Sequence, residues 1–265
     1  MRFAEPIADP SAPLARRNPT AKLAAAVVLT LSLIVSLDPV APAVALVVEL
    51  AVLPLFGLRY RALVARFWPL LVAAGGAAAT YLVFGQRTGE VLVSAGPWVL
   101  TTGMLVSGAS VMLRVFALAL PGIAVFASTD PTDLADSLVQ NAKAPARFAL
   151  GALAALRLLP LLGNDWEMLR MARRARGVDA GGGPLGRLRM FASMTFAMLV
   201  HAIRRGTALA IAMDARGFDS GLSRTYAREQ RFRAADAALV AGAVILSAVA
   251  LAASVATGAF NPVFR

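Results

Sequence analysis

The chain has no cysteine and only one histidine, His201, among its 265 residues. Without cysteine, neither a disulfide framework nor a zinc site built on thiolates is possible. A metal site needs several ligands, and no second histidine exists to join His201. We therefore interpret His201 as a polar residue within an apolar stretch, and we expect neither a metal nor a cofactor.

Charged residues are also scarce, at 15% of the chain, whereas hydrophobic residues make up 58%. A soluble domain carries about a quarter charged residues, so this composition indicates a membrane protein. The net charge of +11 could also suit a nucleic-acid-binding protein, but only two of the 26 basic residues are lysine and no known nucleic-acid motif is present. The basic excess fits the cytoplasmic loops of a multispanning protein better.

Five stretches are apolar over roughly the 20 residues that a membrane-spanning helix needs. They are residues 21–37, 40–58, 67–84, 98–126 and 234–257. The fourth is longer than one span requires and could tilt or protrude. The sequence therefore predicts an all-α membrane protein with about five transmembrane helices.

Basic residues in the short connections set the orientation, because they stay on the cytoplasmic side. Arg16, Arg17 and Lys22 lie at the start of the first span, and three more arginines lie between the second and third spans. The other two short connections contain one arginine between them. The N-terminus is thus predicted to be cytoplasmic, in the inner or plasma membrane of the cell. The predicted domains are a cytoplasmic tail at 1–20, four spans within 21–127, a cytoplasmic region at 128–233, and the last span with a short C-terminus at 234–265.

The cytoplasmic region holds 16 of the 26 basic residues and two long helical patterns that end on nearly the same phrase. The first ends in RRARGVDAG at 173–181, and the second ends in AMDARGFDSG at 212–221. Each phrase contains Ala-Arg-Gly followed by an apolar residue and an aspartate. The chain therefore repeats a helix end, although it does not repeat a whole domain.

Two functions suit this repeated phrase. Gly177 and Gly217 fit the left-handed position that ends a helix, with Arg176 and Arg216 beside the negative end of the helix dipole. An arginine at a helix tip also presents a rigid fork that can bind a carboxylate on another protein. Spacing alone leaves capping and docking equally open.

Together with TDPTDLADSL, ALRLLPLL and the N-terminal PLARRNPTAKL, these phrases resemble the transmembrane T component of energy-coupling factor transporters. The resemblance covers nearly the whole chain and is strongest at 128–226. It implies an ABC-type importer of vitamins or transition-metal ions, in which this chain joins two cytosolic ATPases to a small membrane protein that binds the substrate. It also implies that one Ala-Arg-Gly motif docks each ATPase, through Ala175, Arg176, Gly177, Ala215, Arg216 and Gly217.

The chain has no GxxxxGK[ST] sequence, and therefore no phosphate-binding loop of that kind. We expect no catalytic residues, because a transporter subunit can rely on its partners for ATP hydrolysis. A membrane-embedded transferase for lipid-linked substrates, with a basic cytoplasmic face, is the alternative. Such an enzyme needs carboxylates for Mg²⁺, and Asp130, Asp133 and Asp136 are the only candidate cluster. Their position at a predicted helix start favours capping.

Three methionines in the second long pattern, Met190, Met194 and Met198, are four residues apart and share one helix face. Such a stripe is most often buried core. Methionine is also the adaptable residue of surfaces that accept several partners. In the family that the chain resembles, the coupling helices cradle the substrate-binding subunit, so these residues are also candidates for that contact.

Two charges fall near the middle of predicted spans, Glu49 in the second and Arg114 in the fourth. Ionisable groups at this depth usually face the bundle interior or a partner charge. Under the five-span topology the two residues lie at similar depth. The sequence therefore predicts a structural ion pair between Glu49 and Arg114, with a polar cavity or an interface around Arg114 as the alternative.

Overall fold

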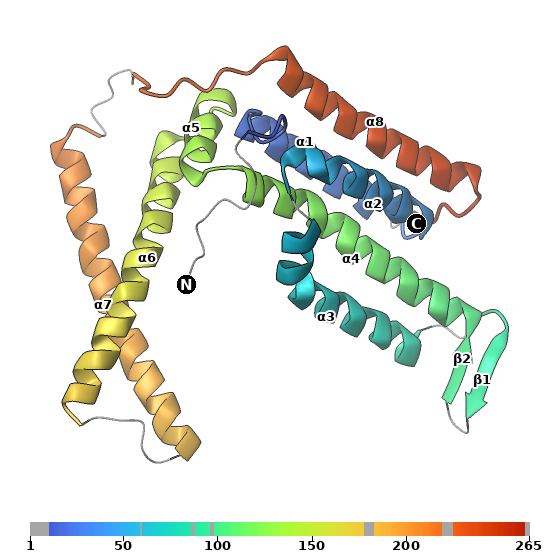
Figure 1. Cartoon of the computed structure of the whole chain (residues 1–265), viewed down its shortest axis with the longest axis horizontal. Coiled ribbons are helices and arrows are strands. Elements are labelled where there is room, and N and C mark those ends of the chain that lie inside the picture. The colour runs from blue at the N-terminus through green and yellow to red at the C-terminus, as the bar shows by residue number, and fades with distance from the viewer. Residues whose placement is uncertain are drawn as a thin grey trace. The chain divides into compact units, whose positions relative to one another are not determined.

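The computed structural model describes residues 11–58, 60–85, 88–95, 98–177, 183–218 and 225–262. Within them the chain is mainly helical and forms two compact units. Among these residues, the bundle unit comprises those from 11 to 143 and from 230 to 262, and the helix-pair unit comprises those from 144 to 229. The elements of both are labelled in Figure 1.

In its described part, the bundle unit contains six α-helices, a short 3-10 helix and a two-stranded hairpin. Four of the helices, α1, α2, α4 and α8, lie side by side with nearly parallel axes, and α3 packs along α4 (Figure 1). In chain order the elements are α1 (Pro19–Ile34), α2 (Val40–Val52), η1 (Leu53–Phe56), α3 (Tyr60–Phe84), β1 (Val91–Ala95), β2 (Trp98–Thr101), α4 (Thr102–Ser128), α5 (Pro131–Asn141) and α8 (Ala234–Ala256).

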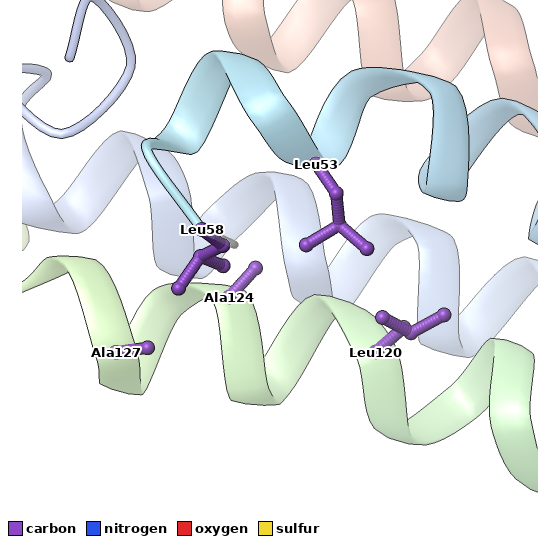
Figure 2. Close-up of a cluster of buried hydrophobic side chains, with 5 residues drawn as sticks. All are labelled: Leu53, Leu58, Leu120, Ala124 and Ala127. Atoms are coloured by element: carbon purple, nitrogen blue, oxygen red, sulfur yellow. The ribbon is translucent and has the colours of Figure 1, made fainter. Parts of the chain in front are cut away.

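Two buried clusters of leucine and alanine hold these helices together. One, drawn in Figure 2, joins the η1 region to α4 through Leu53, Leu58, Leu120, Ala124 and Ala127. The other joins α1, α2, α4 and α8 through Leu33, Ala41, Ala45, Ala117 and Ala250. Small side chains allow close approach of helix backbones, which is how helices commonly pack within a membrane.

The fourth predicted span begins too early. Residues 98–101 form strand β2, which pairs antiparallel with β1, and α4 begins only at Thr102. Apolar composition cannot separate a short strand from a helix turn. The β-branched and aromatic residues on both sides of Gly96 and Pro97 are the hairpin signal that hydropathy overlooked.

Length and composition select a different set of helices from the five predicted spans. Among the described residues, the helices long and apolar enough to cross a membrane are α4 and α8, together with α6 and α7 of the helix-pair unit. The apolar segments at 19–34 and 40–56, and the part of α3 at 68–84, are shorter. A helix of 16 residues is about 24 Å long, less than the roughly 30 Å of a hydrocarbon core.

A buried polar cluster lies where α1 and α4 meet. Lys22 of α1 is only 2% exposed, and its ammonium group donates hydrogen bonds to the carbonyl oxygens of Ala15 at 2.7 Å and Ser128 at 2.9 Å. Ser128 is the last residue of α4, so Lys22 satisfies a carbonyl that the helix itself leaves open. The charged side chain thereby joins the segment before α1 to the end of α4.

The same cluster continues into α8. Asp236 is 2% exposed, and one carboxylate oxygen accepts a hydrogen bond from the backbone N–H of Asn18 at 2.9 Å. The other oxygen accepts from the Arg233 N–H at 2.8 Å, which caps the start of α8. Asp236 therefore binds the first turn of α8 to the residue that precedes α1.

Helix α5 completes this cluster. The Asn18 side-chain oxygen caps α1 by accepting from the Thr20 N–H at 3.0 Å, and it also accepts from the Ser137 hydroxyl at 2.6 Å. Ser137 lies on α5 and is fully buried. Asp130 caps α5 by accepting from the Thr132 N–H at 2.7 Å, in agreement with the capping interpretation. The sequence grouped α5 with the cytoplasmic region, but α5 packs as part of the bundle unit.

The predicted ion pair between Glu49 and Arg114 is wrong. The Arg114 guanidinium donates to the backbone carbonyl of Ser36, and it lies 3.4 Å from the carbonyl of Asp38. Both carboxylate oxygens of Glu49 are buried without a hydrogen-bond partner. Helix α1 ends at Ile34, so the carbonyls that follow have no partner within the helix, and in apolar surroundings they need a donor from elsewhere. Arg114 supplies it.

The connection between α1 and α2 is closed by further hydrogen bonds. The Leu37 N–H donates to the carbonyl of Asn261 at 2.7 Å, and the Ala41 N–H donates to the Asp38 carboxylate at 2.9 Å. Burial opposes ionisation of Asp38, but the nearby hydroxyls of Ser36 and Ser254 and the Ala41 N–H outweigh it and lower the pKa of Asp38. The carboxylate and the Arg114 guanidinium therefore stabilise the same connection.

We expect Arg114→Leu to lower the free energy of unfolding by about 1–3 kcal/mol, because it leaves buried carbonyls without a donor. Glu49→Gln should act independently, so the double variant should equal the sum of the single effects within about 0.5 kcal/mol. Thermal unfolding of the four purified proteins in detergent, followed by circular dichroism, measures this. If the double variant loses clearly less unfolding free energy than the two single variants together, Glu49 and Arg114 interact, and the ion pair would be supported after all.

Candidate docking sites on the helix pair

The helix-pair unit consists of α6 (Ala146–Ala175) and α7 (Gly183–Ala215), which cross one another (Figure 1). The two helices run in opposite directions. Arg173, near the end of α6, donates to the Ser193 hydroxyl near the start of α7 at 2.9 Å. Asp165, earlier in α6, accepts from Arg205, later in α7, also at 2.9 Å. The two helices are therefore antiparallel, and these contacts join them along their crossing.

The Asp165–Arg205 ion pair is a feature that the sequence reasoning missed. Asp165 is 4% exposed, whereas Arg205 is partly exposed. A lone carboxylate is costly to bury, and the partner arginine across the crossing offsets that cost. The sequence offered one clue. Asp165 is the only aspartate of the first long helical pattern, and Arg205 lies opposite it once the second pattern is placed antiparallel to the first.

The first Ala-Arg-Gly motif forms the end of α6. Ala175 is the last helical residue, Arg176 is the capping residue, and Gly177 follows with φ +71°. The Gly177 N–H donates to the carbonyl of Arg174 at 3.0 Å. A positive φ is readily adopted only by glycine, so the motif ends the helix as the capping interpretation predicts.

The second motif forms the end of α7 in the same way. Gly217 has φ +74°, and its N–H donates to the carbonyl of Asp214 at 2.9 Å. The Phe218 N–H donates to the carbonyl of Met213 at 3.2 Å. These two bonds make a Schellman motif, in which a left-handed residue closes the last helical turn. The corresponding residue after Gly177 lies outside the described residues, as do Asp179 and Asp219.

Both motif arginines are exposed at opposite ends of the helix pair. Arg176 and Arg216 have their side chains on the surface, and within the described ranges neither guanidinium makes a hydrogen bond or an ion pair. A helix of 30 residues, the length of α6, is about 45 Å long. One ligand cannot bridge two helix ends so far apart, so the motifs are two separate sites.

The surroundings of the two arginines differ in charge. The last turn of α6 carries Arg173 and Arg174, so Arg176 extends a basic run. The last turn of α7 instead carries Asp214 beside Arg216. Neither end offers a nucleophile beside a base, and the described residues contain no group of His, Cys, Asp or Glu able to hold a metal ion. The geometry suits recognition of an acidic group on a partner.

The methionine stripe lies largely within the helix pair. Met194 is 3% exposed and is next to Ser193, which contacts α6, whereas Met190 and Met198 are half-buried. The burial of Met194 agrees with the core alternative. The surface that a partner could contact is formed instead by apolar side chains of α7 that are 55–77% exposed: Leu185, Leu188, Phe191, Phe196, Leu199, Ile203 and Ile211.

Comparisons with known proteins identify this arrangement. A family model of cobalt transport proteins, CbiQ, matches residues 10–227, which include both Ala-Arg-Gly motifs. The chain belongs to the CbiQ family. The energy-coupling factor transporter transmembrane protein EcfT of Listeria innocua is 31% identical over 190 residues, which cover 68% of this chain and 69% of the relative. The EcfT of Limosilactobacillus fermentum is 29% identical over 187 residues (68% and 70%), and that of Bacillus subtilis is 28% identical over 169 residues (61% and 64%).

Membership of the CbiQ family makes this chain a transmembrane component of energy-coupling factor transporters and a non-catalytic subunit. The alternative of a membrane-embedded transferase is therefore excluded. Its candidate acidic cluster also has other partners, because Asp130 caps α5 and Asp133 accepts a hydrogen bond from the Gln230 side chain at 3.4 Å. The resemblance stated from the motifs is confirmed.

We expect Gly177→Ala to destabilise the end of α6 by about 1–2 kcal/mol, because alanine is strained at φ +71°. A Cβ at this position meets no atom within 4 Å, so backbone strain is the only cost. Gly163→Ala is the matched control, since Gly163 is helical and equally open and should gain up to about 1 kcal/mol of helix propensity. The two variants are compared by following helix content by circular dichroism as the temperature is raised. Equal effects on stability would show that Gly177 does not act as a left-handed helix cap.

Proposed function

We propose that this CbiQ-family protein is the scaffold and coupling subunit that links two cytosolic ATPases to a small membrane protein binding a vitamin or a transition-metal ion. The observation that carries the proposal is the pair of capped helix ends, each with an exposed arginine, at opposite ends of one helix pair. Two equivalent but distant sites suit two similar partners.

Each ATPase would bind one motif arginine through a carboxylate. A guanidinium forms two parallel hydrogen bonds with a carboxylate, which fixes direction as well as contact. The positive φ of Gly177 and Gly217 supports this role, because a left-handed glycine ends each helix sharply and leaves the arginine at its tip. Movement of the ATPases on ATP binding would then act on α6 and α7 directly.

The substrate-binding subunit would contact the exposed apolar side chains of α7, and the half-buried Met190 and Met198 stay further candidates for that contact. Large apolar side chains exposed together along one helix support an interaction site there. The matched family carries the description of cobalt transport, which suits a transition-metal ion as one possible substrate. The substrate itself would be held by the partner subunit.

The proposed topology has α1, α2 with η1, α3, α4 and α8 in the membrane, and α6 and α7 on the cytoplasmic side. Charge supports this choice over the length criterion. Helix α6 carries Arg157, Asp165, Glu167 and Arg170 along its length as well as its basic end. Ionisable residues at so many levels of one helix are costly in a bilayer. The N-terminus is then cytoplasmic.

Charge reversal at the motif arginines tests the docking proposal. Arg176→Glu or Arg216→Glu should release one ATPase each, and the double variant should lose uptake at least tenfold while inserting normally in the membrane. Lysine at either position should also bind poorly, because it lacks the fork. The ATPases are quantified by mass spectrometry after co-purification, and uptake is measured in cells.

The matched controls are Arg157→Glu and Arg204→Glu, which reverse the charge of exposed arginines on the same two helices, away from the motifs. They should retain both ATPases. Normal uptake by the double motif variant would leave only the capping role, and absence of any ATPase from the wild-type preparation would overturn the scaffold itself.

Single cysteines test the topology without interference, because the chain has none of its own. A membrane-impermeant maleimide applied to intact spheroplasts should label Thr88→Cys. It should label His201→Cys and Tyr226→Cys only after the membrane is opened, because these two positions are proposed to be cytoplasmic. All three positions are exposed on the protein, so each can react once the reagent reaches it. Failure of His201→Cys to react in opened membranes would place the middle of α7 inside the bilayer.

A further inference from the structure

Within the part of the chain that the structure describes, the chain crosses between its two units at two points, and both belong to the surroundings of α5. It leaves the bundle unit after Lys143, two residues beyond the end of α5, and it returns at Gln230. Lys143 has φ +54°, a left-handed conformation that is uncommon for a residue with a side chain. The exit from α5 is therefore a defined sharp turn.

The returning segment is held by α5 itself. The backbone N–H of Gln230 donates to the side-chain oxygen of Gln140 at 2.8 Å, and the Gln230 side-chain amide lies 3.4 Å from the Asp133 carboxylate. Asp133 and Gln140 are seven residues apart, so they lie on one face of α5. All these contacts are within the bundle unit.

The same face of α5 is anchored to the bundle. Ser137 lies between Asp133 and Gln140 in the helix, is fully buried, and donates to the Asn18 side chain at 2.6 Å. Its oxygen is also 2.6 Å from the Thr20 hydroxyl of α1. Helix α5 thus holds the outgoing chain covalently, the returning chain by hydrogen bonds, and α1 through a buried hydroxyl.

We propose that α5 is a clasp, formed by Asp133, Gln140 and Gln230, that keeps the two crossing points together while the helix pair moves. This rests on the proposed coupling function. A helix pair held by two separate flexible tethers would transmit little force to the bundle, whereas one held at a single fixed base moves as one body. Gln140 and Gln230 are then positioning residues for energy coupling and not for assembly.

The first test opens the clasp. Gln140→Met keeps the length of the side chain but removes the acceptor of the Gln230 N–H, and Asp136→Asn is the control because Asp136 lies on α5 outside these contacts. In proteoliposomes containing the whole transporter, Gln140→Met should retain both ATPases and their hydrolysis, while uptake per ATP hydrolysed falls at least threefold. An unchanged ratio would overturn the clasp.

The second test closes the clasp reversibly. Gln140→Cys with Gln230→Cys removes the native contact, and a short thiol-specific cross-linker that reduction can cleave then joins the two positions. Coupling should be low before cross-linking, recover when the link is made and fall again on cleavage. In the single-cysteine variants the cross-linker and its cleavage should leave coupling unaltered, and in Gln140→Cys coupling should stay low throughout. Loss of uptake in the linked protein would show that the crossing points separate during transport, which contradicts the proposal.

The two proposals fail differently in these experiments. If the coupling function is wrong, the wild-type preparation contains no ATPases, and uptake per ATP hydrolysed cannot be measured for any variant. If only the clasp is wrong, the ATPases are present, the wild-type couples normally, and Gln140→Met couples equally well.

Discussion

The burial of the Lys22 ammonium within a mostly apolar helix bundle is the constraint on which one end of the bundle depends. A buried cation must be hydrogen-bonded and balanced by charge. The carbonyls of Ala15 and Ser128 supply the hydrogen bonds, and Asp236 is near enough to supply the charge. Meeting this requirement brings the segment before α1, the end of α4 and the start of α8 to one place. Helix α5 is held there through Asn18.

Much of the chain's character could be predicted from local patterns. Hydropathy indicated a helical membrane protein, and the glycines of the Ala-Arg-Gly motifs marked helix ends that the structure confirms, because helix periodicity and left-handed glycine depend only on neighbouring residues. The motifs also identified the family. The hairpin start of the fourth span was missed because four apolar residues have no clear period.

Pairing between distant polar groups could not be predicted in the same way. Asn18 and Asp236 are 218 positions apart, and nothing in either neighbourhood indicates the other. The similar depth of Arg114 and Glu49 in the membrane suggested that they pair. The backbone carbonyls after the end of α1 are the acceptors instead, and a comparison of charged residues alone does not include them. Backbone groups at helix ends are part of the polar inventory of a membrane bundle, and sequence patterns do not show which of them lack a partner.

The charge difference between the two helix ends has a consequence for assembly order. Three arginines at the α6 end attract an acidic partner over a distance set by ionic screening, whereas one arginine and one aspartate at the α7 end nearly cancel beyond close contact. If acidic partners dock at both ends as proposed, encounter at the α6 end would be faster and more sensitive to salt, even for two identical partners. Two similarly capped helix ends would then differ in association rate, and the first subunit to arrive would favour the α6 end.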